Sequence, residues 1–119
     1  HGTYDLMEAI RRLQAFEAAG ADLLYCPVPP GRAELVQILA AVKKPVNALA
    51  AGPLKRLTVA ELATMGVRRI STGSQLARLT HAAIRDATSA MLGQGSFAPL
   101  LGTADGDEID ALLLKGSAR

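Results

Sequence analysis

The alternation of helical and strand patterns along the chain limits its fold more than any other feature. Short apolar runs at residues 21–26, 45–49 and 67–71 predict three strands. Segments with apolar residues at helical spacing precede, separate and follow these strands. Such alternation is typical of a parallel sheet whose strands are joined by right-handed helical crossovers. The sequence therefore predicts an α/β fold.

Capping residues mark the ends of several expected helices. Asp5 and Thr58 are each followed by a glutamate three residues later, which is the pattern of a capping box at a helix start. Gly20 and Gly66 each stand between a helical pattern and the next strand, where a helix C-cap favours glycine. The five expected helices cover residues 5–18, 33–43, 58–64, 75–92 and 107–114.

Composition excludes several classes of function. The 119 residues carry a formal charge of +2 with acids and bases interspersed, and only 3% are aromatic, which argues against nucleic-acid binding. No apolar run approaches the roughly 20 residues that a membrane span needs. The single cysteine, Cys26, fits a reducing compartment. We therefore expect a cytoplasmic protein that binds neither nucleic acid nor membranes.

The stretch at residues 66–74 joins the third expected strand to the longest expected helix and ends in small residues. Backbone amides around Ser71 and Gly73, together with the start of the helix, favour a bound phosphate or carboxylate. In a (β/α)8 barrel an anion site commonly follows the seventh or eighth strand. A helix cap and a tight turn account for serine and glycine equally well, and both interpretations can hold together.

Five phrases, in order along the chain, carry a resemblance to a known family. They are RLQAFEAAGADLLY at residues 12–25, KPVN at 44–47, LTVAEL at 57–62, GVRRISTGS at 66–74 and GSF at 95–97. Together they resemble the isocitrate lyase / phosphoenolpyruvate mutase superfamily, and in particular its smaller phosphonomutase-like branch.

The resemblance implies a (β/α)8 TIM-type barrel of which this chain forms the C-terminal half. Its three strands would be the fifth to seventh, completed by an N-terminal half or by a partner chain. The full-length enzyme would use Mg2+ and act on a small 2-oxo or 2-hydroxy carboxylate, as a C–C lyase or a P–C mutase. The family's metal ligands and catalytic loop lie on earlier strands, so we expect neither in residues 1–119. Residues 75–119 would form a helical segment swapped with a neighbouring subunit of a homo-oligomer.

Asn47, Ser71 and Gly73 are the candidate substrate-binding residues. Asn47 is expected to end the second strand, where the chemistry of such barrels is located, and it matches a family asparagine that can contact the substrate carboxylate. The alternative is an asparagine bonded to local backbone. For the adjacent Arg68 and Arg69, which face opposite ways on a strand, we expect structural ion pairs.

The segment after the first strand departs from the family pattern. Many lyases of the superfamily carry a glutamate at the position of Pro27, and the phosphonomutase-like branch often has glycine at the position of Val28. Cys26 is expected to be a buried apolar side chain rather than a nucleophile. These departures favour one alternative, a half-barrel that binds or assembles without catalysis. A second alternative is an aldolase-like or phosphate-binding barrel of another family.

Overall fold

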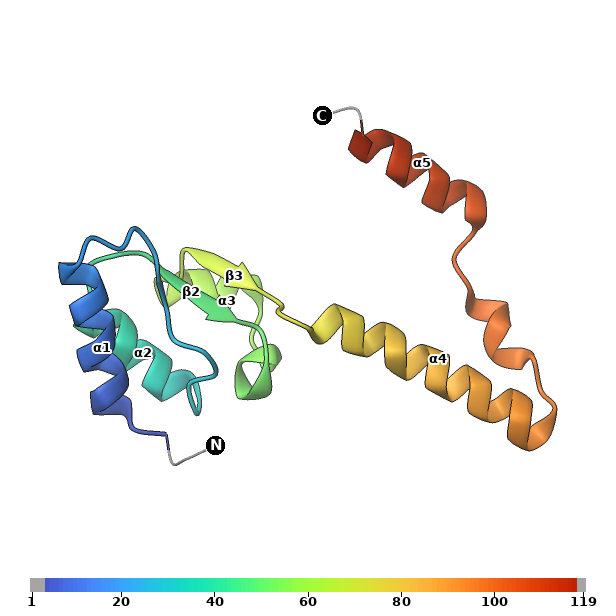
Figure 1. Ribbon diagram of the computed structural model, residues 1–119, viewed down its shortest axis with the longest axis horizontal. Coiled ribbons are helices and arrows are strands. Elements are labelled where there is room, and N and C mark those ends of the chain that lie inside the picture. The colour runs from blue at the N-terminus through green and yellow to red at the C-terminus, as the bar shows by residue number, and fades with distance from the viewer. Residues whose placement is uncertain (1–3, 118–119) are drawn as a thin grey trace. The chain divides into compact units, whose positions relative to one another are not determined.

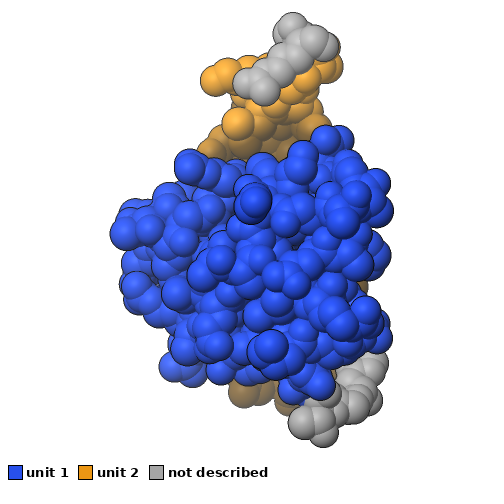
Figure 2. All heavy atoms as spheres, turned by 90° about the vertical axis from the view of Figure 1, so that its left-hand side faces the viewer, with its two compact units in different colours: residues 1–76 blue, residues 77–119 orange. Residues whose placement is uncertain are grey.

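The computed structural model describes residues 4–117, which fall into two compact units divided after Leu76 (Figure 2). The first unit contains α1 (Leu6–Ala18), β1 (Leu24–Tyr25), α2 (Arg32–Ala41), β2 (Val46–Leu49), the 3-10 helix η1 (Gly52–Arg56), α3 (Val59–Thr64) and β3 (Arg69–Ser71) (Figure 1). The strands form one parallel sheet in the order β1-β2-β3. This confirms the predicted α/β alternation and the parallel sheet.

Helices account for the regular structure of the second unit. It holds most of α4 (Gln75–Gln94), the 3-10 helix η2 (Ala98–Gly102) and α5 (Gly106–Ser117). The helix α4 extends two residues beyond the expected end at residue 92, through the first of the two glycines expected to stop it, and ends before the second, Gly95, whose φ is a left-handed +63°. None of the described side chains of α4 or α5 is buried. Among the residues that the structure describes, no helix combines the length and hydropathy of a membrane span.

The register of the sheet sorts its side chains onto two faces. In parallel strands, paired residues lie on the same face, and successive residues of one strand lie on opposite faces. Leu24 pairs with Val46, and Ala48 pairs with Ile70. These four residues make one face apolar, and the helices of the first unit pack against it.

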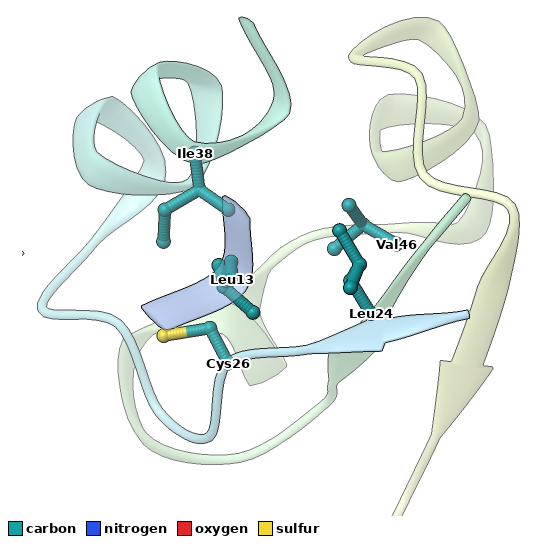
Figure 3. Close-up of a cluster of buried hydrophobic side chains, with 5 residues drawn as sticks. All are labelled: Leu13, Leu24, Cys26, Ile38 and Val46. Atoms are coloured by element: carbon teal, nitrogen blue, oxygen red, sulfur yellow. The ribbon is translucent and has the colours of Figure 1, made fainter. Parts of the chain in front are cut away.

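Two clusters of buried side chains form the core on this face. The first joins α1, β1, α2 and β2, and its side chains point toward one another in Figure 3: Leu13, Leu24, Cys26, Ile38 and Val46. The second joins α2, β2, η1, α3 and the segment between α3 and β3: Leu35, Ala48, Leu54, Leu62 and Val67. The burial of Cys26 confirms that this thiol packs as an apolar side chain.

Glycines end α1 and α3 in the same way. The φ angles of Gly20 and Gly66 are +96° and +102°, in the left-handed region that only glycine enters at little cost. After each glycine, a backbone N–H donates back to a carbonyl five residues earlier, at 3.0 Å from Ala21 and 3.1 Å from Val67. The turn after α1 takes up residues 19–23, which is why β1 is shorter than the strand expected from residue 21.

The two expected N-terminal caps are present, with one difference. At α3, Thr58 and Glu61 form the complete capping box. At α1, Asp5 accepts from the backbone N–H of Glu8, but the Glu8 carboxylate turns to Arg11 and Arg12. Hydrogen bonds from these two arginines lower the pKa of Glu8 from 4.5 to about 2. The cap therefore forms without the reciprocal bond because two nearby cations compete for the carboxylate.

A glutamate side chain holds α1 to the turn that precedes β2. Oε1 of Glu17 accepts hydrogen bonds from the backbone N–H groups of Lys43 at 2.8 Å and Lys44 at 2.6 Å. Replacing Glu17 by alanine removes both bonds, so we expect the free energy of unfolding to fall by about 1–2 kcal/mol. Urea unfolding of the full-length protein measures this loss. Glu17→Gln keeps one side-chain oxygen and is expected to lose less. An unchanged unfolding midpoint in Glu17→Ala would contradict the role.

Candidate substrate-binding site

The second face of the sheet is polar, and it brings together residues from all three strands. Tyr25 pairs with Asn47, Asn47 pairs with Arg69, and Leu49 pairs with Ser71. Because these pairs continue the same alternation, all five side chains belong to the face opposite the apolar core. No aspartate or glutamate lies at these sheet positions, and Arg69 gives the face a positive charge.

Asn47 is the centre of this polar face. Its side chain is only 3% exposed, and both ends of its amide are bonded. Nη1 of Arg69 donates to Oδ1 of Asn47 at 2.9 Å, and Nδ2 of Asn47 donates to Oγ of Ser71 at 3.0 Å. Side-chain partners on the next strand therefore fix the amide, and the alternative of bonding to local backbone is wrong for its side chain.

The position of Asn47 within its strand differs from the expected one. It is the second residue of β2, and the strand continues for two more residues to Leu49. The expectation that Asn47 ends the strand is therefore wrong, whereas the expected end of the strand at residue 49 is confirmed. Its side chain nevertheless bonds to Ser71, the last residue of β3, because Ser71 lies two positions beyond the residue that pairs with Asn47.

Ser71 and Gly73 have separate structural roles. Ser71 is half-buried at the end of β3, and its hydroxyl bonds to Asn47. Gly73 lies in the turn before α4 with a φ of +54°, and a Cβ added there would meet Cδ1 of Leu49 at 3.0 Å. Among the described residues, the backbone N–H of Gly73 has no hydrogen-bond acceptor. Only a residue without a side chain fits this turn unstrained.

The adjacent arginines do not behave as expected. Within residues 4–117, neither Arg68 nor Arg69 makes an ion pair, so the expectation of structural salt bridges is wrong there. The acids that pair with cations in the first unit are Glu8 and Glu61, which lie on helices. Arg69 instead bonds to the amide of Asn47. The sequence carried a signal for this contact, because Arg69 and Ser71 are two residues apart and therefore lie on the same face of their strand.

The departure at Val28 has a structural counterpart. Val28 adopts a φ of +48°, which a β-branched residue enters at a cost of about 1–3 kcal/mol. Its Cγ1 lies 3.0 Å from the place that a Cβ on Gly52 would take. The loops after β1 and β2 therefore touch at the carboxyl end of the sheet.

The side chain of Cys26 contacts a tyrosine near the start of the described chain. Sγ of Cys26 lies 3.2 Å from the hydroxyl of Tyr4, and burial raises the pKa of that phenol.

No metal centre is formed by the part of the chain that the structure describes. Within residues 4–117, no three side chains of histidine, cysteine, aspartate or glutamate lie close enough together to hold a metal ion. Four carboxylates of the first unit cap helices, pair with arginines or hold the turn before β2: those of Asp5, Glu8, Glu17 and Glu61. The described residues therefore do not fit a Mg2+ site by themselves.

The sequence of the chain has curated relatives, one of which has an assigned activity. It is 37% identical over 79 residues to an oxaloacetate decarboxylase of Paraburkholderia xenovorans, which is 66% of this chain and 26% of that protein. It is also 37% identical over 70 residues to an uncharacterised protein of Mycobacterium tuberculosis, 59% of this chain and 26% of that protein. The chain matches about a quarter of the length of these curated relatives.

The structure has counterparts among solved structures. A lyase/mutase-type protein of Burkholderia cenocepacia is 36% identical with a TM-score of 0.86, and the match covers 96% of this chain and 41% of that one. An oxaloacetate acetylhydrolase in complex with its product oxalate is 26% identical with a TM-score of 0.67, over 94% of this chain and 42% of that one. A phosphoenolpyruvate phosphomutase of Streptomyces platensis, at 22% identity and a TM-score of 0.69, shares the fold.

The match to a family model covers most of the chain. The model described as phosphoenolpyruvate phosphomutase matches residues 1–92 of the 119. The chain is also similar to a decarboxylase and to a solved lyase/mutase-type protein, at 37% and 36% identity. The chain therefore belongs to the phosphoenolpyruvate phosphomutase family, within the isocitrate lyase / phosphoenolpyruvate mutase superfamily.

Proposed function

We propose that the chain is part of an enzyme that acts on a small 2-oxo or 2-hydroxy carboxylate, as a C–C lyase. The polar face of the sheet carries this proposal. It combines a buried amide, a hydroxyl and a guanidinium on one surface, and no acidic side chain lies at its sheet positions. Such a surface matches a carboxylate, because its charged group, the Arg69 guanidinium, is positive and carries only hydrogen-bond donors.

In this proposal, Asn47, Ser71 and Gly73 bind the substrate carboxylate. The amide and the hydroxyl are bonded to each other at 3.0 Å, so one carboxylate can contact both. The N–H of Gly73 has no acceptor within the described chain, and Gly73 follows Ser71 by two residues. A backbone donor and a side-chain donor near the carboxyl end of β3 suit an anion.

The proposal includes a barrel in which β1, β2 and β3 are the fifth, sixth and seventh strands. Helices pack on the apolar face, as they do on the outside of such a barrel, and the polar face would then line its interior. The match to about two fifths of the length of solved relatives supports this arrangement. The remaining strands would come from an N-terminal half or from a partner chain.

We also propose that the full-length enzyme uses Mg2+, which in this family stabilises negative charge that develops on the substrate. The described residues provide no ligand set, so the ligands would lie outside this chain. The buried free thiol of Cys26 suits a cytoplasmic location.

Residues 75–119 are proposed to pack against a neighbouring copy in a homo-oligomer. Large apolar side chains are exposed along this segment, and water disfavours such surfaces. They are Leu76, Leu79, Ile84, Leu92, Phe97, Leu100, Leu101, Ile109, Leu112, Leu113 and Leu114. A swapped helical segment would cover them.

The activity can be tested with the full-length protein, Mg2+ and two substrates. Oxaloacetate reports C–C cleavage through the appearance of pyruvate or acetate in proton NMR spectra, at a rate above that of a sample without protein, because oxaloacetate also loses CO2 slowly by itself. Phosphoenolpyruvate reports mutase activity through a new P–C signal in phosphorus NMR spectra. We expect cleavage of oxaloacetate or a related 2-hydroxy acid, lost with EDTA and restored by Mg2+. Absence of turnover, together with no thermal stabilisation by oxalate and Mg2+, would contradict the proposal.

A binding or assembly module without catalysis is the second candidate. The observation in its favour is that the described residues hold no metal-ligand set. In the same experiment this candidate predicts stabilisation by oxalate without turnover of any substrate. The two functions therefore give different results with the same protein sample.

A further inference from the structure

We propose that Arg69, Asn47 and Ser71 form a one-way hydrogen-bond relay that makes the Ser71 hydroxyl a donor toward an anionic ligand. Arg69 is the positioning residue of this relay, because it acts on the ligand through Asn47. The inference rests on the proposed carboxylate site, and it adds a residue and a mechanism to that site.

The first step is the orientation of the Asn47 amide. A guanidinium carries only donors, so the atom of Asn47 that faces Arg69 must be its oxygen. Nη1 of Arg69 and Oδ1 of Asn47 are 2.9 Å apart, a normal length for this bond. The other end of the amide is then the nitrogen, and it faces Ser71.

The second step is the polarity of Ser71. The amide nitrogen of Asn47 can only donate, so Oγ of Ser71 accepts at 3.0 Å. The hydroxyl hydrogen of Ser71 is then left to donate elsewhere. None of the described residues accepts a hydrogen bond from Ser71. A ligand at the carboxyl end of β3 is the natural acceptor.

The third step is the stability of this arrangement. Asn47 is only 3% exposed, so reversing its amide would leave the Arg69 bond unmade with little access to water. The charge on Arg69 polarises Asn47, and a polarised amide strengthens the next bond in a chain. The relay therefore holds one direction, from the guanidinium to the hydroxyl.

The chemical consequence is selectivity for an acceptor. A carboxylate oxygen can take the Ser71 hydrogen in a charge-assisted bond, whereas an uncharged donor group of the same shape cannot. The relay does not require direct contact between Arg69 and the ligand. This separates it from a site in which Arg69 acts only as a nearby positive charge.

Binding of oxalate to the full-length protein in the presence of Mg2+, measured by calorimetry, tests the relay. We expect Ser71→Ala and Arg69→Met each to weaken binding roughly tenfold or more. Arg69→Gln removes the charge but keeps a donor for Asn47, so it is expected to bind more tightly than Arg69→Met. Arg69→Lys keeps both properties. Equal weakening by Gln and Met would overturn the relay in favour of simple charge attraction.

A double-mutant cycle gives a sharper test. In Asn47→Asp, the carboxylate accepts from both Arg69 and Ser71, so the Ser71 hydrogen turns away from the ligand. Ser71→Ala should then cost nothing further in this background, whereas it costs about tenfold in the wild type. The same loss in both backgrounds would overturn the relay.

Two outcomes separate the relay from the proposed function. If wild-type protein does not bind oxalate, the carboxylate site fails and the relay fails with it. If wild-type protein binds oxalate and Ser71→Ala weakens binding whereas Arg69→Met does not, only the relay fails. Thermal unfolding of each variant shows whether it remains folded. Arg69 is exposed, so we expect its substitutions to be tolerated.

Discussion

Substituting Asn47 by alanine in the full-length protein is expected to raise the KM for the carboxylate substrate at least tenfold while leaving the protein folded. Nδ2 of Asn47 lies 3.0 Å from the Ser71 hydroxyl. The change therefore removes the Asn47 contact with the ligand, and it leaves the Ser71 hydroxyl without the bond that orients it. Hydrogen bonds to charged groups contribute about 1.5–3 kcal/mol, which sets this magnitude. Unfolding becomes easier by roughly 1–3 kcal/mol as well, because Arg69 and Ser71 lose their common partner.

The control for this change is Val46→Ala, on the same strand but on the opposite face. Val46 is 2% exposed and packs in the apolar core, so its truncation costs about 1–2 kcal/mol of stability. Its KM should stay near the wild-type value. Steady-state kinetics and urea unfolding of both variants separate binding from stability. Wild-type kinetics in Asn47→Ala would contradict the proposal that this residue binds the substrate.

The substitution Gly73→Ala is expected to lower stability by roughly 2–3 kcal/mol and to weaken carboxylate binding. The left-handed φ of +54° costs an L-residue about 1–2 kcal/mol. The new Cβ would also meet Cδ1 of Leu49 at 3.0 Å, so one of the two must move. Urea unfolding and oxalate titration measure the two losses.

The double variant Leu49→Ala with Gly73→Ala separates these two causes. Removing the Leu49 side chain relieves the close contact but leaves the backbone conformation unfavourable. We expect Gly73→Ala to cost less in the Leu49→Ala background than in the wild type, by about 1 kcal/mol. Equal costs in both backgrounds would mean that the contact with Leu49 does not limit this turn.

Local patterns in the sequence were enough to predict most of the elements. Helix caps depend only on residues a few positions apart in the sequence. The structure contains the capping box of Thr58 and Glu61 and the left-handed glycines at positions 20 and 66. The alternation of helices and strands follows from side-chain periodicity, which is also local. The order of elements and the parallel sheet were therefore predictable.

The details of the polar face depend on which residues pair across strands, and that information is not local. The bond from Arg69 to Asn47 joins residues 22 apart, and the bond from Asn47 to Ser71 joins residues 24 apart. The alternation of side chains within a strand of three or four residues does not specify which residues of the neighbouring strands it pairs with. The sequence therefore named Asn47 and Ser71 as candidates but assigned Asn47 to the strand end and Arg69 to an ion pair.

The division of the sheet into an apolar and a polar face has a consequence for folding. If β2 slipped by one residue, Asn47 would enter the space that Val46 or Ala48 occupies, and its amide would be buried without partners. Burying such a group costs about 1–3 kcal/mol in proteins, and the slip would also expose the apolar residues beside it. Asn47, which is proposed to bind the substrate, thus also disfavours a shifted register of β2. Variants that improve binding at position 47 must preserve that alignment, which restricts the substitutions available to evolution at this site.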